Sequence, residues 1–285
     1  MKTERISSKN NPLIVRLSKL KEKKYRELEG LFALDGEKLF LEALRFGAET
    51  EYIVLSETYY NKSEKTVSDA LVTFGQTETS VILVPDSIFE KITSEKSPQG
   101  IITVAKTIDF FKKYTTIYNN EKFFTEPRAT IMLCDIRDPG NLGTVLRCAS
   151  AFELDAVYIT DGCTDLFSPK AVRGSMGALF KTPIRFESNA IAHVRNLRSN
   201  GVKVYAAALD RSAISLDELE IESDQSVCFV IGNEGHGLGD NIIAECDRSV
   251  FIPMAPNTES LNASVASSVL MWELYKRKLL SKKRK

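Results

Sequence analysis

Three polar loops, rich in glycine or asparagine, each follow an apolar stretch of the chain and limit its possible folds more than any other feature. The loops lie within residues 135–149, 230–238 and 252–264. Glycine adopts backbone conformations that other residues avoid, and it lets a ligand approach the chain closely. Such loops at the ends of buried strands predict a protein that wraps its backbone around a small ligand.

Strands and helices alternate through the second half of the chain. We expect strands at residues 130–134, 156–160, 202–206, 227–231 and 249–252, and helices at residues 142–152, 169–176, 190–199, 240–244 and about 261–279. This alternation predicts an α/β fold with a doubly wound parallel sheet. Ligands bind such sheets beyond the carboxyl ends of the strands, and all three loops begin at such an end.

The first half predicts a smaller α/β arrangement. Asn11 and Pro12 suit the cap and first position of a helix. Strands at residues 31–34, 52–55, 81–84 and 101–105 and a helix at residues 37–46 follow. A length of 285 residues suits about two domains. We therefore expect a small domain over residues 1–106, a polar linker over residues 107–127 and a second domain over residues 128–285.

Charge is distributed unevenly although the formal net charge is zero. Residues 1–30 carry nine Lys and Arg against four Asp and Glu, and residues 276–285 carry seven basic residues and no acid. Clustered cations at both ends predict contact with a polyanion such as RNA. The alternative is a solvated tail that only aids solubility.

Several classes of protein are disfavoured by the sequence. No apolar run approaches the roughly 20 residues that span a bilayer, and the polar N-terminus lacks a signal region, so we expect a cytoplasmic protein without membrane contact. The five cysteines are scattered and the only histidines are His193 and His236, so we expect no metal site. Neither a Walker A motif nor a Gly-x-Gly-x-x-Gly strand-to-helix turn is present.

The loops closely resemble the three signature motifs of the SpoU/TrmH family of RNA ribose 2′-O-methyltransferases. The matching segments are residues 138–143 with Arg147 and Ala149, residues 232–237, and residues 252–254 with 260–264. Residues 168–178 also resemble a family segment. The resemblance covers about residues 128–278. More weakly, the N-terminal stretch resembles the L30e-like substrate-binding domain of family members that act on rRNA.

The resemblance implies a catalytic domain with a trefoil knot (the SPOUT fold), a homodimer formed through that domain, and S-adenosylmethionine as methyl donor. It places the donor against the second and third motifs. The residues it implies as donor contacts are Gly232, Ile252 and Leu261, with Met254 and Ala263 nearby.

The resemblance also implies a catalytic group of Arg147, Asn141, Glu234, Ser260 and Asn262. A guanidinium has a pKa above 12 and is a poor base. We therefore expect Arg147 to orient the target phosphate and hydroxyl and to stabilise the developing alkoxide. Asn141 would position Arg147 or the RNA, and Glu234 would hold the arginine or the loop, or act as the base. Ser260 and Asn262 would bind donor or ribose and cap the final helix.

Simpler interpretations exist for the same residues. Asn141 and Ser260 each suit the cap of the helix that follows them. Arg147 suits a surface charge, and the resemblance does not require His236 for catalysis. Co-occurrence of the motifs at three separate strand ends favours the catalytic interpretation.

We therefore predict an RNA 2′-O-ribose methyltransferase that uses S-adenosylmethionine and acts on large-subunit rRNA. The alternative substrate is tRNA, and rRNA methylation that confers antibiotic resistance is a third possibility. A non-catalytic RNA-binding relative is the alternative from another class, and the retained motif residues speak against it. A small-molecule methyltransferase has little use for the basic ends of this chain.

Overall fold

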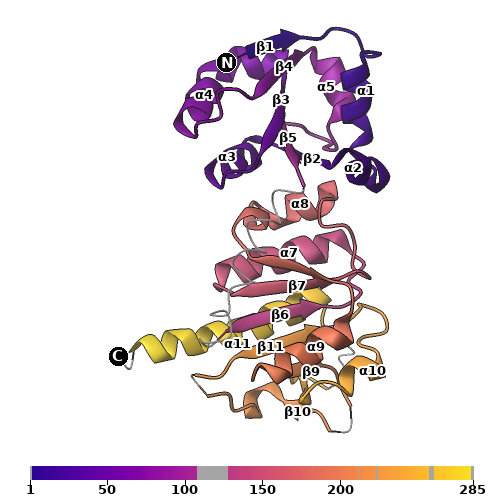
Figure 1. The fold of residues 1–285 in the computed structure, drawn as a ribbon, viewed down its shortest axis with the longest axis vertical. Coiled ribbons are helices and arrows are strands. Elements are labelled where there is room, and N and C mark those ends of the chain that lie inside the picture. The colour runs from indigo at the N-terminus through magenta and orange to yellow at the C-terminus, as the bar shows by residue number, and fades with distance from the viewer. Residues whose placement is uncertain (1, 108–127, 211, 223, 257–259, 284–285) are drawn as a thin grey trace. The chain divides into compact units, whose positions relative to one another are not determined.

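The computed structural model describes residues 2–107, 128–210, 212–222, 224–256 and 260–283. Contacts between Cα atoms divide the chain into two compact units (Figure 1). The first unit comprises Met1–Lys112 with Asp165–Lys181, and the second comprises Lys113–Thr164 with Thr182–Lys285. The expected linker, residues 107–127, lies outside the described residues apart from Thr107.

The first unit is built on a five-stranded mixed sheet. Its strands lie in the order β1 (Lys2–Arg5), β4 (Ser80–Val84), β3 (Thr50–Ser56), β5 (Ile101–Lys106) and β2 (Leu31–Asp35). Its helices from the N-terminal part of the chain are α1 (Pro12–Lys19), α2 (Lys23–Glu29), α3 (Glu37–Arg45), α4 (Glu57–Thr73) and α5 (Asp86–Ile92). β5 is antiparallel to both of its neighbours, whereas β3 and β1 run parallel to β4.

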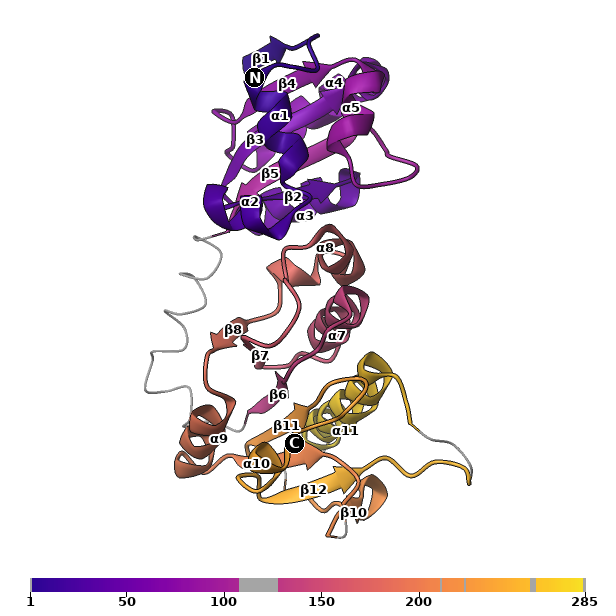
Figure 2. The ribbon, with the colours of Figure 1, turned by 90° about the vertical axis from the view of Figure 1, so that its right-hand side faces the viewer.

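Helices cover both faces of this sheet, and β3 shows why (Figure 2). Ile53 and Leu55 belong to a core that includes Phe40 of α3, whereas Val54 belongs to a core that includes Phe89 of α5. Successive side chains of a strand point to opposite faces of the sheet. A strand buried on both faces therefore reads as a continuous apolar run.

A stretch from the second half of the sequence packs into the first unit. It contains α8 (Pro169–Ser175) and the 3₁₀ turn η2 (Ala178–Phe180). Arg26, only 4% exposed, donates from Nε to Asp165 Oδ2 at 2.9 Å. The rings of Phe32 and Phe167 lie 4.7 Å apart. These buried contacts group the stretch with the first unit. The sequence predicts it instead as part of the second domain, residues 128–285.

Asp165→Asn is expected to lower the free energy of unfolding by about 3–5 kcal/mol, because it leaves the Arg26 guanidinium buried without its counter-charge. Urea denaturation followed by circular dichroism measures the change. The matched control is Glu27→Gln, which removes an exposed ion pair with Lys23 whose side chains are 62% and 66% exposed. That change should cost less than about 1 kcal/mol. Equal losses in the two variants would contradict a stabilising role for the buried pair.

The second unit contains a seven-stranded sheet. Its strands lie in the order β10 (Ile214–Ser215), β12 (Arg248–Phe251), β9 (Lys203–Ala207), β11 (Val227–Ile231), β6 (Ala129–Leu133), β7 (Ala156–Thr160) and β8 (Ile184–Glu187). Each pair of neighbouring strands in that order is parallel. The predicted α/β fold with a parallel sheet is confirmed.

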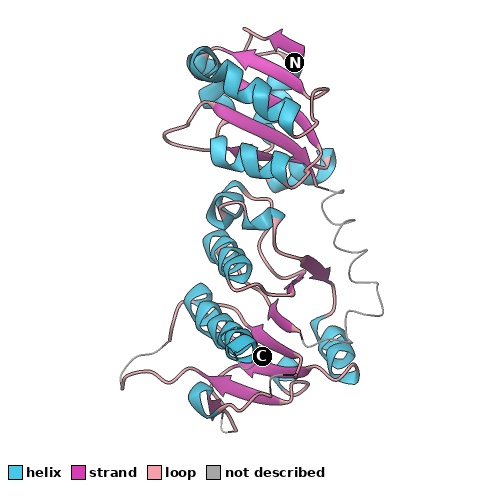
Figure 3. Ribbon diagram, turned by 90° about the vertical axis from the view of Figure 1, so that its left-hand side faces the viewer, coloured by secondary structure: helices cyan, strands magenta, loops and turns pink. Residues whose placement is uncertain are grey.

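Helices again cover both faces of the sheet (Figures 2 and 3). α7 (Pro139–Ala151) and α11 (Ala263–Lys283) pack against each other on one face. α9 (Ala190–Ser199) and α10 (Asp240–Ile243) contribute to the core on the other face, and the 3₁₀ turn η3 (Leu216–Glu218) follows β10. Within the described residues, no helix combines the length and the apolar character that a membrane crossing requires.

Candidate active site

The three loops come together at one edge of the second unit's sheet. β6 and β11 are parallel neighbours with Leu133 opposite Ile231, so the first two loops leave the sheet side by side. The amide of Cys134 continues this pairing by donating to the Ile231 carbonyl at 2.8 Å. The third loop follows β12 and leads into α11, which returns to pack against α7. Strand order and helix packing thus gather motifs that are about 100 residues apart.

A chain of side-chain hydrogen bonds joins all three motifs. Asn262 Nδ2 of the third motif donates to Asn141 Oδ1 of the first at 3.0 Å. Asn141 Nδ2 donates in turn to Glu234 Oε1 of the second at 2.8 Å. In each asparagine the side-chain nitrogen donates and the side-chain oxygen accepts. These hydrogen bonds therefore fix how the three loops meet. Three of the five predicted catalytic residues therefore lie together.

Glu234 supports the loops and is poorly suited to be a base. Its carboxylate also accepts the amide protons of Arg137 at 3.2 Å and Asp138 at 3.3 Å. Partial burial acts to raise the pKa of Glu234, but the hydrogen bonds from Asn141 and from these amides outweigh burial and hold the pKa below its usual range. A carboxylate with its lone pairs engaged and its pKa lowered accepts a further proton poorly.

Asn141 does not cap the helix that follows it, so the capping interpretation is wrong. Asp138 is the cap, because its Oδ1 accepts the amide protons of Gly140 at 2.6 Å and Asn141 at 3.0 Å. The helix α7 therefore begins at Pro139 rather than at Leu142. This earlier start places Asn141 in the first turn, with its side chain available to the other motifs.

Ser260 likewise does not cap the final helix. Asn262 Oδ1 accepts the amide protons of Ser264 at 2.9 Å and Val265 at 3.4 Å, so α11 begins at Ala263. Asn262 thus performs two tasks, capping α11 with its oxygen and binding Asn141 with its nitrogen.

Arg147 lies apart from this hydrogen-bonded chain. It is exposed on α7, and it forms no hydrogen bond or ion pair with any residue that the structure describes. Arg147 follows Asn141 by six positions, which places the two side chains about 120° apart on a helix with 3.6 residues per turn. The guanidinium is therefore held on a rigid helix with its donors available to an incoming ligand.

A pocket of about 440 Å³ lies beyond the ends of β9 and β12. It is lined by residues 207–209, 250–252, 254–256, 260, 261, 266 and 270. The predicted donor contacts Ile252, Met254 and Leu261 and the predicted catalytic residue Ser260 all line it, whereas Gly232 and Ala263 do not. Its volume is in the range of small-molecule and cofactor sites, which is about 300–1,000 Å³.

Gly232 is required by the shape of the second loop. A Cβ atom at this position would lie 2.3 Å from the carbonyl carbon of Gly237 and 2.4 Å from the nitrogen of Leu238. The loop closes through reciprocal backbone hydrogen bonds of 3.0 Å between Asn233 and Gly237. The close approach leaves no space for a side chain, so Gly232 shapes the loop that carries Glu234.

Asp135 is a residue of this site that the sequence analysis missed. It follows β6 with φ of 59°, in the left-handed region. Its carbonyl oxygen accepts Asn233 Nδ2 at 2.8 Å, which is a further link between the first and second motifs. Its only signal in the sequence is its place directly after an apolar run, since aspartate tolerates left-handed backbone better than most residues.

Comparison with known proteins supports the same interpretation. Residues 128–272, or 145 of the 285 residues, match the SpoU rRNA Methylase family. This chain belongs to that family. Residues 11–103 match the MRM3-like substrate binding domain. The family resemblance of the loops and of the N-terminal stretch is confirmed.

Two relatives match this family member over most of its length. The 23S rRNA (guanosine(2553)-2'-O)-methyltransferase RlmP of Bacillus subtilis is 30% identical over 95% of this chain and 99% of its own. The mitochondrial rRNA methyltransferase 3 of Xenopus tropicalis is 30% identical over 90% of this chain and 74% of its own.

Solved structures match both units. An AdoMet-bound rRNA methyltransferase from Sinorhizobium meliloti has a TM-score of 0.80 at 26% identity and covers 97% of this chain and 98% of its own. An RNA 2'-O ribose methyltransferase has a TM-score of 0.77 at 26% identity and covers 97% of this chain and all of its own.

Proposed function

We propose that this protein transfers a methyl group from S-adenosylmethionine to a ribose 2′-hydroxyl of large-subunit rRNA. The observation that carries the proposal is the series of hydrogen bonds from Asn262 to Asn141 to Glu234, which joins all three family motifs beside a pocket of cofactor size. The Bacillus subtilis relative, named for this reaction on 23S rRNA, matches 95% of the chain and supports the substrate class.

The pocket suits the donor in size and in lining. Ile252, Met254 and Leu261 offer apolar surface and backbone polar groups at its wall, and Ser260 offers a hydroxyl. When bound, S-adenosylmethionine supplies an electrophilic methyl group. The lining residues would bind the donor, exclude water and aim that methyl group at the acceptor.

Arg147 serves the acceptor side in this proposal. The ribose 2′-oxygen must lie in line with the methyl group and bear growing negative charge as its proton leaves. A guanidinium stabilises that charge and binds the neighbouring phosphate, because its planar set of N–H donors matches oxyanions. Asn141 and Asn262 fix the loops against which the ribose would lie.

We further propose that the protein is a cytoplasmic homodimer with a trefoil knot, active in rRNA processing. The dimer would form through the second unit, where Trp272 remains 45% exposed although its ring lies 5.8 Å from that of Phe152. Support for the knot is the strand order, in which β11 lies between β9 and β6 while α11 returns over β6 and β11.

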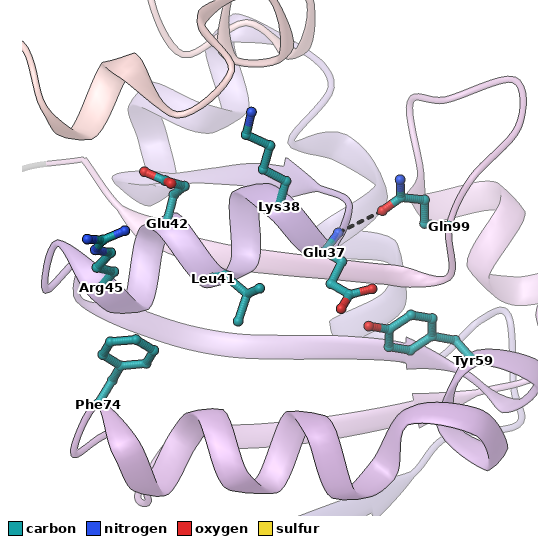
Figure 4. Close-up of a pocket in the computed structure, with 8 residues that line it drawn as sticks. All are labelled: Glu37, Lys38, Leu41, Glu42, Arg45, Tyr59, Phe74 and Gln99. Carbon is teal, nitrogen blue, oxygen red and sulfur yellow. Dashed lines mark hydrogen bonds between the residues drawn. The ribbon is translucent and has the colours of Figure 1, made fainter. Parts of the chain in front are cut away.

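The first unit is proposed to read the RNA. A groove of about 810 Å³ runs between α3 and α4, and Figure 4 shows the side chains that line it. Leu41 and Phe74 in the groove are each 37% exposed, and Arg45 stands beside them. Unpaired bases stack on aromatic side chains while cations hold the backbone. The groove therefore offers both kinds of contact that single-stranded RNA uses.

The double variant Phe74→Ala with Arg45→Ala is expected to weaken RNA binding about tenfold, since one stacked base is worth about 1–3 kcal/mol. Donor binding by calorimetry should not change. Val72→Ala is the matched control, because Val72 is 65% exposed on α4 but does not line the groove. Substitution is preferable to deletion of residues 1–106, which would remove the packing partners of Asp165–Lys181.

The function is tested by incubating the protein with radiolabelled S-adenosylmethionine and separate pools of unmodified rRNA and tRNA. Label in rRNA that resists alkaline cleavage at a single site is the expected result. Label confined to tRNA would replace the proposed substrate. A third outcome is that the protein binds the donor yet transfers no label to rRNA, to tRNA or to assembling large-subunit particles. That result would favour the non-catalytic relative.

A further inference from the structure

Asp135 holds side chains from both neighbouring loops through its carboxylate. Its Oδ1 lies 2.5 Å from Nη2 of Arg137, and its Oδ2 lies 3.3 Å from Nε2 of His236 and 3.3 Å from Nδ2 of Asn233. Arg137 belongs to the first loop, while Asn233 and His236 belong to the second. The Asp135 carboxylate thus restrains Arg137 with one oxygen, while Asn233 and His236 hold its other oxygen in place.

The backbone around Asp135 is built to keep that carboxylate in place. Its φ of 59° lies in the left-handed region, which most residues with a side chain avoid and aspartate tolerates better. A Cβ atom at Gly162 would lie 2.9 Å from Asp135 Oδ1, so the glycine makes room for the carboxylate. The left-handed backbone and the space left by Gly162 together hold the carboxylate in one position after β6.

The arginine that Asp135 holds faces solvent. The Arg137 side chain is 69% exposed, whereas that of Asp135 is 28% exposed. One guanidinium nitrogen faces the carboxylate, and the remaining N–H donors have no other partner among the described residues. An arginine restrained in this way loses less rotamer freedom when it binds an oxyanion.

The arginine also adjoins the proposed acceptor site. The backbone amide of Arg137 donates to the Glu234 carboxylate, which also accepts a hydrogen bond from Asn141. The two nearby carboxylates are engaged, since Glu234 accepts backbone amides and Asp138 caps α7. We propose that Arg137 binds a backbone phosphate of the RNA next to the methylated ribose, and that Asp135 is the positioning residue that holds it there. This inference rests on the proposed function.

The test is RNA affinity as a function of salt, measured by fluorescence anisotropy on the rRNA fragment that the protein methylates. Arg137→Ala should weaken binding about tenfold and reduce the slope of log K against log salt by about one, the signature of one lost phosphate contact. Because the side chain of Arg137 is exposed, its removal should leave the stability of the folded protein nearly unchanged. An unchanged slope would overturn the proposal.

Asp135→Asn distinguishes positioning from charge, because the two predict opposite signs. Removing a carboxylate near a polyanion should by charge alone tighten RNA binding. Loss of the restraint on Arg137 should instead weaken it about two- to tenfold. Asparagine tolerates the left-handed backbone, so the loop is retained. Tighter or unchanged binding would overturn the positioning role, as would a loss that persists in the Arg137→Ala background.

Arg195 and Glu245 supply the matched controls. Arg195 is 65% exposed on α9 and also paired with a carboxylate, at 2.5 Å from Glu245. Arg195→Ala and Glu245→Gln should leave the salt slope unchanged. Donor affinity should be equal in all variants.

The failure of this inference and the failure of the proposed function have different signatures. If the wild-type protein methylates RNA while Arg137→Ala keeps the wild-type slope of log K against log salt, only this inference fails. If the wild type methylates no RNA, the proposed function fails.

Discussion

Arg147→Ala is expected to slow methyl transfer to RNA by about 10²–10³-fold while leaving the affinity for S-adenosylmethionine within about twofold of wild type. The guanidinium is exposed on α7, forms no hydrogen bond or ion pair with any described residue, and does not line the 440 Å³ pocket. Its loss should therefore remove stabilisation of charge on the acceptor and nothing from the donor site. Single-turnover kinetics and calorimetry measure the two quantities separately.

Two further variants sharpen this test. Arg147→Lys keeps the charge but not the planar fork, so it should recover only part of the lost rate. Thr144→Ala removes an exposed side chain one turn earlier on the same helix and should transfer methyl groups at nearly the wild-type rate. Near wild-type turnover in Arg147→Ala would refute its role, and a large loss of donor affinity would move that role to the donor site.

Gly232→Ala is expected to reduce kcat/KM by at least about 100-fold, because displacement of a catalytic group by about 1 Å has that effect. The added Cβ would meet backbone atoms of Gly237 and Leu238 at 2.3–2.4 Å, and backbone cannot rotate away as a flexible side chain can. The loop must open, and Glu234 then loses its hydrogen bonds from the backbone amides of Arg137 and Asp138 and from Asn141 Nδ2. Steady-state kinetics of methyl transfer to the unmodified rRNA fragment measure the loss.

Gly235→Ala is the matched control in the same loop. A Cβ atom there would meet only Asn233 Oδ1, at the ordinary contact distance of 3.4 Å, so activity should stay within a few-fold of wild type. If both glycine variants lose activity equally, general sensitivity of the loop explains the effect. If neither does, the close approach at Gly232 is unimportant for transfer.

Hydrophobic pattern was sufficient for most elements of the second unit. Strands 156–160 and 227–231 and helix 190–199 have the expected bounds, and every residue of β7 and β11 is buried. Short, continuous apolar runs of this kind are typical of strands covered on both faces. Asn11 also caps α1 as expected, by accepting the amide proton of Leu13 at 2.9 Å.

Capping was harder to predict, because neighbouring residues compete for the same task. Asp138 and Asn141 both suit an N-cap, as do Ser260 and Asn262. In each pair, the residue whose oxygen reaches the first free amides became the cap, which is Asp138 for α7 and Asn262 for α11. Short-range sequence carries no information about which of two suitable side chains has that geometry.

Local pattern and motif spacing determined that three polar loops follow strands of an α/β sheet, since burial and periodicity act over a few residues. Strand order decided that the loops meet, and that order depends on contacts between distant segments. The bonds from Asn141 to Glu234 and Asn262, the Asp135–Arg137 pair and the burial of Arg26 against Asp165 arise only in the folded chain. Such contacts have no local signature because each needs a partner that the fold alone brings within hydrogen-bond distance.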